Sequence, residues 1–183
     1  IDVPDANFVV ANSVNGRGEV VGFSRKDLEP RHGFLWHKGV LTPIEVPGAS
    51  SRGPRISGIN DQRQIVGAYP DMDNHLHGFL LRKGVYTTLD APGSEGGFTF
   101  AQSLNNRGQI VGYYSTEADA PGSGSDRGFV LDKGVYTLID LPGALWTAVT
   151  SINSKGEIVG AYEDENGVHG FKGTPVRKQQ HTN

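Results

Sequence analysis

The segment Ser57-Gly-Ile-Asn60, followed by Gln64-Ile-Val-Gly67 and His77-Gly-Phe79, occurs four times in closely similar form in this chain of 183 residues. Its asparagine recurs at intervals of 45, 45 and 48 residues, as Asn15, Asn60, Asn105 and Asn153. Self-similarity at a period of roughly 20–50 residues is typical of solenoids, propellers and other repeat architectures. The repeat therefore governs any prediction of the fold.

Each copy of the repeat predicts four short β-strands. In the second copy, we expect them around residues 55–59, 64–68, 78–79 and 85–89. These blocks are rich in β-branched and aromatic residues, end in turn-forming residues and show no helical spacing. Four strands in about 45 residues match one blade of a β-propeller.

Two repeated residue types carry local predictions. A glycine in each second strand indicates that a neighbouring strand approaches too closely for a side chain; these are Gly22, Gly67, Gly112 and Gly160. The repeated asparagine begins a polar turn, where we expect it to tolerate the positive φ of a tight hairpin.

We therefore predict an all-β fold, a four-bladed β-propeller in a single domain. The repeats cover residues 1–43, 44–88, 89–138 and 139–175, and residues 176–183 form a polar tail. The last copy lacks its fourth strand, whereas Ile1-Asp2-Val3-Pro4 has the sequence of a fourth-strand end. We expect this N-terminal stub, or part of the tail, to dock onto the fourth blade and close the ring of a monomer. The alternative is an eight-bladed ring closed by two chains.

Composition and charge narrow the classes of partner. The net charge of −3 provides no field to attract nucleic acid or an anionic membrane. The absence of cysteine excludes disulfides and thiolate metal sites. No apolar run approaches the roughly 18 residues of a membrane-spanning helix, and no signal peptide is visible in this chain. We expect neither nucleic acid nor a membrane as partner.

The repeated phrase also resembles a known family. The pattern of Ile139-Asp-Leu-Pro-Gly-Ala144, Gly-Ile-Asn with Gln-Ile-Val-Gly, and His77-Gly-Phe-Leu80 is similar to that of the bacterial HAF-repeat proteins. These are described as probable extracellular repeat proteins, expected to be propellers, with no general activity assigned. The resemblance covers essentially the whole chain and implies an extracellular or periplasmic bacterial protein, without catalytic residues to carry over. The third copy departs from the pattern at Arg127 and in a longer loop over 118–126.

Repeated histidines and tyrosines are the candidate catalytic groups. In a meandering propeller, the loops between strands two and three share one face with the segments between blades. The side chains expected there are His32, His77, His169, Tyr69, Tyr114 and Tyr162. Converging imidazoles could bind a metal or act as a general base. The preferred interpretation is structural, with each histidine satisfying backbone groups at a hairpin mouth.

Repeated acids raise the question of a metal. Asp2, Glu45, Asp90 and Asp140 precede the Pro corners, where they could surround a cation, although capping of the turn through backbone N–H groups is the preferred interpretation. The loops over 71–74 and 163–167 alternate oxygen ligands but lack a full calcium-loop pattern. We therefore predict no metal or cofactor, with calcium in the pore or in these loops as the alternative.

Residues that differ between the copies are the candidate ligand-binding residues, because variable loops on a repeated scaffold carry specificity. They are Arg52, Arg55, Phe98, Arg127 and Trp146. Aromatic rings beside arginines suit a sugar, an aromatic ring or a carboxylate. Packing between blades is the competing interpretation for the aromatic residues.

Two functions remain open. The first is a ligand-binding or scaffold propeller that recognises a carbohydrate, a small carboxylate or aromatic ligand, or a protein. The alternative is an enzyme of lyase or cyclase type, in which a tyrosine or histidine abstracts a proton while Arg52 or Arg55 stabilises the anion. No nucleophile elbow, phosphate loop or zinc-binding HExxH motif is present.

Overall fold

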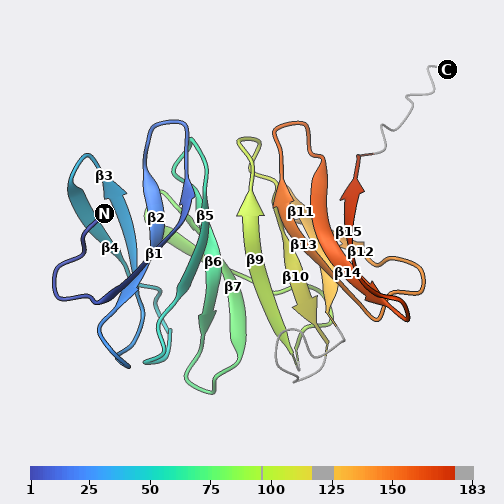
Figure 1. Cartoon of the computed structure of the whole chain (residues 1–183), viewed down its shortest axis with the longest axis horizontal. Coiled ribbons are helices and arrows are strands. Elements are labelled where there is room, and N and C mark those ends of the chain that lie inside the picture. Colours follow the sequence, from blue (N-terminus) through green and yellow to red (C-terminus); the bar gives the residue numbers. More distant parts are fainter. Residues whose placement is uncertain (96, 117–125, 176–183) are drawn as a thin grey trace.

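The chain folds into antiparallel β-meanders, one for each repeat (Figure 1). The computed structural model describes residues 1–95, 97–116 and 126–175. Unit 1 contains β1 Phe8–Val14, β2 Val20–Arg25, β3 His32–His37 and β4 Val40–Ile44. Unit 2 contains β5 Arg55–Ile59, β6 Ile65–Pro70, β7 Leu76–Arg82 and β8 Val85–Leu89. Unit 3 contains β9 Phe98–Leu104, β10 Ile110–Ser115, β11 Arg127–Asp132 and β12 Val135–Ile139, and unit 4 contains β13 Trp146–Ile152, β14 Ile158–Asp164 and β15 Gly167–Gly173.

The predicted all-β class is confirmed, since the described residues contain strands and turns but no helix. It follows that no helix among them has the length and hydropathy needed to cross a membrane. Unit 4 has three strands in the described residues, as the sequence predicted. The long loop of the third copy and the polar tail lie outside the described residues, apart from Asp126.

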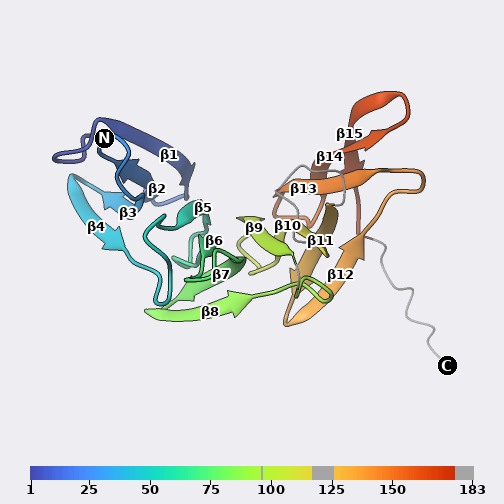
Figure 2. The ribbon, with the colours of Figure 1, turned by 90° about the horizontal axis from the view of Figure 1, so that it is seen from below.

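The units stand side by side in an open arc (Figure 2). The first strand of each unit lies on the inside of the arc, and the fourth strands β4, β8 and β12 lie on the outside. A single parallel pair, Leu76 with Phe98, joins the sheets of units 2 and 3. The prediction that the N-terminal stub closes a four-bladed ring is wrong, because Ile1–Pro4 lies beside unit 1, at the opposite end of the arc from unit 4 (Figure 1). Within the described residues, no strand of unit 4 pairs with unit 1.

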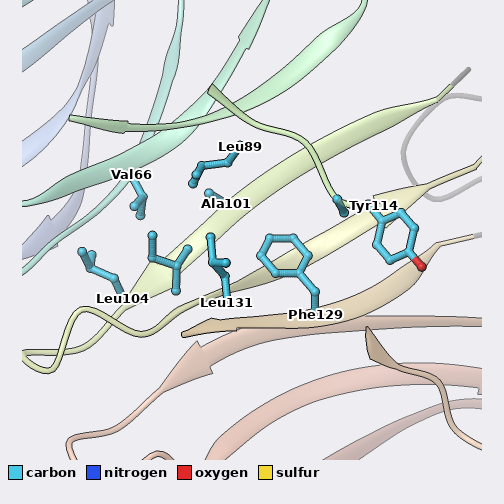
Figure 3. Packing of buried hydrophobic residues seen from close by; sticks show 9 residues of the cluster. Val66, Leu89, Ala101, Leu104, Tyr114, Phe129 and Leu131 are labelled. Atoms are coloured by element: carbon cyan, nitrogen blue, oxygen red, sulfur yellow. The ribbon is translucent and has the colours of Figure 1, made fainter. Parts of the chain in front are cut away.

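Apolar side chains between neighbouring units form the core. The second strand of units 1, 2 and 3 turns a valine toward the following unit, as Val66 does toward Ala101 and Phe129 of unit 3 (Figure 3). The preceding isoleucine, such as Ile65, faces the other way, toward Val21 of unit 1. Full burial of one such side chain contributes about 1.5–3 kcal/mol. Each interface therefore depends on the same repeated positions.

The repeated glycine of the second strand has the role that the sequence predicted. A Cβ on Gly112 would lie 1.8 Å from the carbonyl oxygen of Phe100 and 2.9 Å from the Phe129 ring. The register of β9 shifts at this point, which brings its backbone close to β10. Only glycine fits there, and the other three positions are equally crowded, at Gly22, Gly67 and Gly160.

The repeated asparagine has a different role from the one predicted. The positive φ of each Asn turn falls on its fourth residue, for example Arg63 with φ 56°, and not on the asparagine. The Oδ1 atom of Asn60 accepts the N–H groups of Gln62 and Gln64 at 3.1 and 2.9 Å. Its Nδ2 donates to the carbonyl oxygen of Asn105 in the next unit at 3.0 Å.

The same inter-unit bond recurs along the array. Asn15 Nδ2 donates to the carbonyl oxygen of Asn60 at 3.0 Å, and Asn105 Nδ2 donates to that of Asn153 at 2.9 Å. We call the four side chains, Asn15, Asn60, Asn105 and Asn153, the asparagine ladder. The ladder closes each turn and also links it to the next unit, so it fixes the position of one unit on another.

Candidate functional site

A pocket of about 740 Å³ opens at the opposite end of the strands from the asparagine ladder, between units 1 and 2. Its walls come from the β2–β3 loop, the segment that joins units 1 and 2, the β6–β7 loop and the start of β9. This volume is in the range of small-molecule sites, about 300–1,000 Å³. The pocket lies on the face where the sequence placed the variable loops.

Four arginines line this pocket, and we call it the arginine pocket. Arg25 ends β2, Arg31 precedes β3, Arg52 lies between the units and Arg55 begins β5. Backbone contacts bring them together, since the N–H of Arg31 donates to the carbonyl oxygen of Arg52 at 3.2 Å. The chain approaches so closely here that a Cβ on Gly53 would lie 1.9 Å from the carbonyl oxygen of Arg31.

Aromatic rings support three of the guanidinium groups. Arg25 lies 4.8 Å from the ring centroid of Phe8, Arg31 lies 5.5 Å from that of Phe23, and Arg55 lies 5.5 Å from that of Phe100. Such cation–π contacts contribute about 0.5–1 kcal/mol at exposed sites. They hold the planar groups in place without neutralising them.

No described carboxylate forms an ion pair with the arginines of the pocket. Among the described residues, the buried Nε of Arg25 also has no hydrogen-bond partner. Burial and the neighbouring charges of Arg55, Arg25 and Arg52 lower the pKa of Arg31. One carboxylate, Glu29, also lines the pocket.

A second hollow, of about 390 Å³, continues the arginine pocket along the inside of the arc. Arg31, Arg55 and Phe100 line both. The hollow adds the polar side chains of Asn12, Ser57, Gln102 and Tyr113. The pocket and the hollow together offer arginine side chains near the β2–β3 loop and hydrogen-bonding groups along the first strands of the units.

Three of the five predicted ligand-binding residues, Arg52, Arg55 and Phe98, line the arginine pocket. Phe98 is only 4% exposed and packs edge-to-face against Phe100 and Tyr113, so it supports the wall and offers no open ring face. The other two are not in its lining. Arg127 pairs with Asp140 at 3.4 Å, and Trp146 donates to the carboxylate of Glu163.

Sequence reasoning missed Arg25 and Arg31. Both occupy positions where the copies differ, since Arg25 aligns with Pro70, Ser115 and Glu163. The criterion that selected Arg52 and Arg55, a difference between the copies, therefore also applies to Arg25 and Arg31. The sequence does not show that the β2–β3 loop of unit 1 contacts the segment over 51–53.

The six candidate catalytic residues do not converge. His77 Nδ1 lies 2.9 Å from Asp90 and its Nε2 lies 3.3 Å from Asp71, while the tilted ring of Tyr69 lies 5.5 Å from its ring, between centroids. His169 and Tyr162 form a similar pair in unit 4, where His169 bonds to Asp164 at 3.1 Å. The prediction that the repeated histidines bond to backbone groups is wrong for His77 and His169, because their hydrogen-bond partners are carboxylates.

The charges near His77 set its protonation. Burial alone would lower the pKa of His77, but its hydrogen bonds to Asp90 and Asp71, and their charges, outweigh burial and raise it. Tyr114 is 4% exposed, within the core between units 2 and 3. None of the six candidates, His32 included, lines the arginine pocket, so the base that the lyase alternative places beside Arg55 is not among them.

The acidic residues have partners of their own. Asp90 bonds to His77, and Asp140 pairs with Arg127. The partners that the structure describes for these two acids are therefore side chains, whereas capping of backbone N–H groups was expected. Potential ligand atoms of Asp71, Asp73 and His75 lie within 4.8 Å of one another, at the loop over 71–74 that was the alternative site for calcium and at the residue after it. The carboxylate of Asp71 already accepts the N–H groups of Asp73 and His75, at 2.9 and 2.8 Å.

Comparison with models of known protein families and with curated proteins gives no match. Among solved structures, the chain is similar to the six-bladed β-propeller fucose-binding lectin of Aleuria aurantia, a fungus, with 14% sequence identity and a TM-score of 0.38. The match covers 90% of this chain and 62% of the lectin. The chain thus spans less than two thirds of the length of that lectin.

Proposed function

We propose that this protein is a binding protein for a ligand that carries two or more carboxylate groups, held in the arginine pocket. An acidic oligosaccharide and a small polycarboxylate share this chemistry. The observation that supports the proposal is the convergence of four guanidinium groups without an acidic partner among the described residues. Bringing like charges together disfavours folding, and a bound polyanion would remove that cost.

Arginine suits this role better than lysine would. Its planar group donates two parallel hydrogen bonds to one carboxylate, and the rings of Phe23 and Phe100 hold two such groups in place. Four groups exceed the need of one carboxylate, which favours a ligand with several. The polar hollow along the first strands would receive the uncharged remainder of an elongated ligand, such as the hydroxyl groups of a sugar chain.

Isothermal titration calorimetry with oligogalacturonate, its neutral galactose counterpart and citrate tests the proposal. We expect binding of at least one acidic ligand, weakened by salt because ionic screening reduces the attraction, and no binding of the neutral sugar. Preference for oligogalacturonate over citrate identifies an extended ligand, and the reverse identifies a small polycarboxylate.

Charge-neutral variants make the test specific to the pocket. We expect Arg55→Gln to weaken binding about tenfold or more, because each lost charge-assisted hydrogen bond contributes about 1.5–3 kcal/mol. Arg17→Gln, in the asparagine turn at the other end of unit 1, changes the net charge equally and should leave the affinity unaltered. An equal effect of both variants, or no binding of either acidic ligand, contradicts the proposal.

A further inference from the structure

In the part of the chain that the structure describes, the two outer faces of the arc have no neighbouring unit, whereas every internal face has one. We define the head face as the side of unit 1 turned away from unit 2, with Val14, Val20 and Trp36. The tail face is the side of unit 4 turned away from unit 3, with Val159, Gly170 and Lys172. These positions follow from the register of the repeats, in which Val14 corresponds to Ile59, Leu104 and Ile152.

Burial differs sharply between equivalent positions. Val14 is 63% exposed, whereas its three counterparts are at most 8% exposed and pack against the preceding unit. Val159 is 44% exposed, whereas Val21, Val66 and Val111 are fully buried against the following unit. Val14 on the head face and Val159 on the tail face are therefore exposed, although their counterparts are buried in inter-unit interfaces. Beside Val159, Lys172 replaces Leu35, Leu80 and Val130 of the other copies and pairs with Glu157 of its own unit.

The asparagine ladder is open at both ends in a complementary way. Asn153 Nδ2 has one acceptor among the described residues, the carboxylate of Glu157 in its own turn, and so has a donor hydrogen left for a following unit. The carbonyl oxygen of Asn15 accepts from Gly18 within its turn but from no preceding asparagine. One end offers the donor that the other end needs.

Gly170 of the tail face has open space where the equivalent glycines of units 1 to 3 are crowded. In units 1 to 3, a Cβ on the corresponding glycine would clash with the fourth strand or the next unit, as Gly33 would with Ile44 and Ile56 at 2.8 and 2.9 Å. On Gly170, the nearest atom to a Cβ is the carbonyl oxygen of Gly160, at 3.9 Å. Unit 4 thus retains a glycine that nothing in the described part of this chain requires.

We propose that the tail face binds the head face of a second copy of this chain, which continues the three interfaces already present within the chain. In this contact, Ile1 and Val3 of the second copy would take the places that Ile44 and Val46 occupy in unit 1, beside Gly170. A head-to-tail contact either closes into a ring or continues as a filament. Propellers typically have about 4–8 blades, and two copies supply eight units, so two such contacts close one ring.

The mass of the chain in solution tests the proposal. By light scattering after size-exclusion chromatography, we expect a species of twice 19.6 kDa. Gly170→Val should halve that mass with an unchanged circular dichroism spectrum, because its side chain has room in the single chain but meets the partner in the ring. Val85→Asp is the control, since Val85 is 65% exposed at a turn tip away from both faces, and it should remain a two-chain species.

Mixing two variants tests the head-to-tail arrangement. Gly170→Val blocks the tail face and Val14→Lys blocks the head face, so each variant alone should be a single chain. An equimolar mixture retains one intact contact and should recover a two-chain species at high concentration. A wild-type chain that stays single at about 100 µM, a polymer whose mass grows with concentration, or a mixture that does not associate would overturn the proposal.

Discussion

The two ends of the strands use the same scaffold in opposite ways. At the end of the strands that carries the asparagine turns, Asn15, Asn60 and Asn105 make equivalent bonds, and units 1, 2 and 3 are each linked to the next unit by the same atoms. At the loop end, the units differ, and units 1 and 2 bring together like charges that repel one another. The repeated residues therefore stabilise this protein, whereas the residues that interrupt the repeat form its candidate site.

The largest expected effect comes from breaking the asparagine ladder. Asn60→Ala removes four hydrogen bonds at a side chain that is 3% exposed and leaves the backbone N–H groups of Gln62 and Gln64 without the oxygen that accepts them. We expect the free energy of unfolding to fall by about 3 kcal/mol, since each orphaned buried group costs about 1–3 kcal/mol. Chemical denaturation measures this loss. Ser154→Ala, at the exposed residue that follows Asn153, is the control, and a similar small loss in both variants would show that the ladder does not stabilise the fold.

The next largest expected effect is a pH-dependent contribution of Glu19 to stability, at the end of the strands that carries the asparagine turns. Burial alone would raise the pKa of Glu19, but hydrogen bonds from Asn15 and Arg63 and the charge of Arg63 outweigh burial and lower it. The carboxylate therefore stabilises the fold above its unfolded pKa of about 4.3, and this contribution is lost as the pH falls through the lower folded pKa.

Glu19→Gln should remove that contribution, because it keeps the shape of the side chain without its charge. Arg63 is 55% exposed, so the expected loss at pH 7 is only about 1 kcal/mol. Thermal unfolding of both proteins between pH 7 and pH 3 gives the difference, which should shrink toward acid. A difference that stays constant with pH would assign the effect to shape and not to charge.

The smallest effect has the opposite sign and belongs to the loop end. Arg52 is exposed and its charge lowers the pKa of Arg31, so Arg52→Gln relieves repulsion. We expect a gain of a few tenths of a kcal/mol, about 0.5 at most, in low salt and less in high salt. The same substitution should weaken binding of the acidic ligand. A variant that loses both stability and affinity would mean that Arg52 supports the fold.

Much of the fold could be predicted from the sequence because its signals are local. The strands, the three-stranded last unit and the crowded Gly112 follow from turn residues and from the spacing of apolar residues. The asparagine was correctly identified as the repeated anchor, but its role was assigned to positive φ. The actual role requires a carbonyl oxygen 45 residues away, as for Asn15 and Asn60, which no local signal shows.

For the candidate site, the variable positions pointed to Arg52 and Arg55, but not to Arg25 and Arg31 beside them. Phe98 was a ligand-binding candidate with packing between blades as the competing interpretation, and neighbouring aromatic rings cover it. Arg127 and Trp146 looked similar to Arg52 as interruptions of the repeat. Instead, Arg127 pairs with Asp140 of the next repeat, and Trp146 donates to Glu163 of its own repeat.

The all-β repeat and the positions at which its copies differ can be read from the sequence, because periodicity and turn chemistry act over a few residues. The open arc, the shared pocket of four arginines and the exposure of Val14 and Val159 required the folded structure. Curvature, charge convergence and burial depend on how one unit packs on the next. Those distances are set between residues about 45 positions apart, beyond the reach of local patterns.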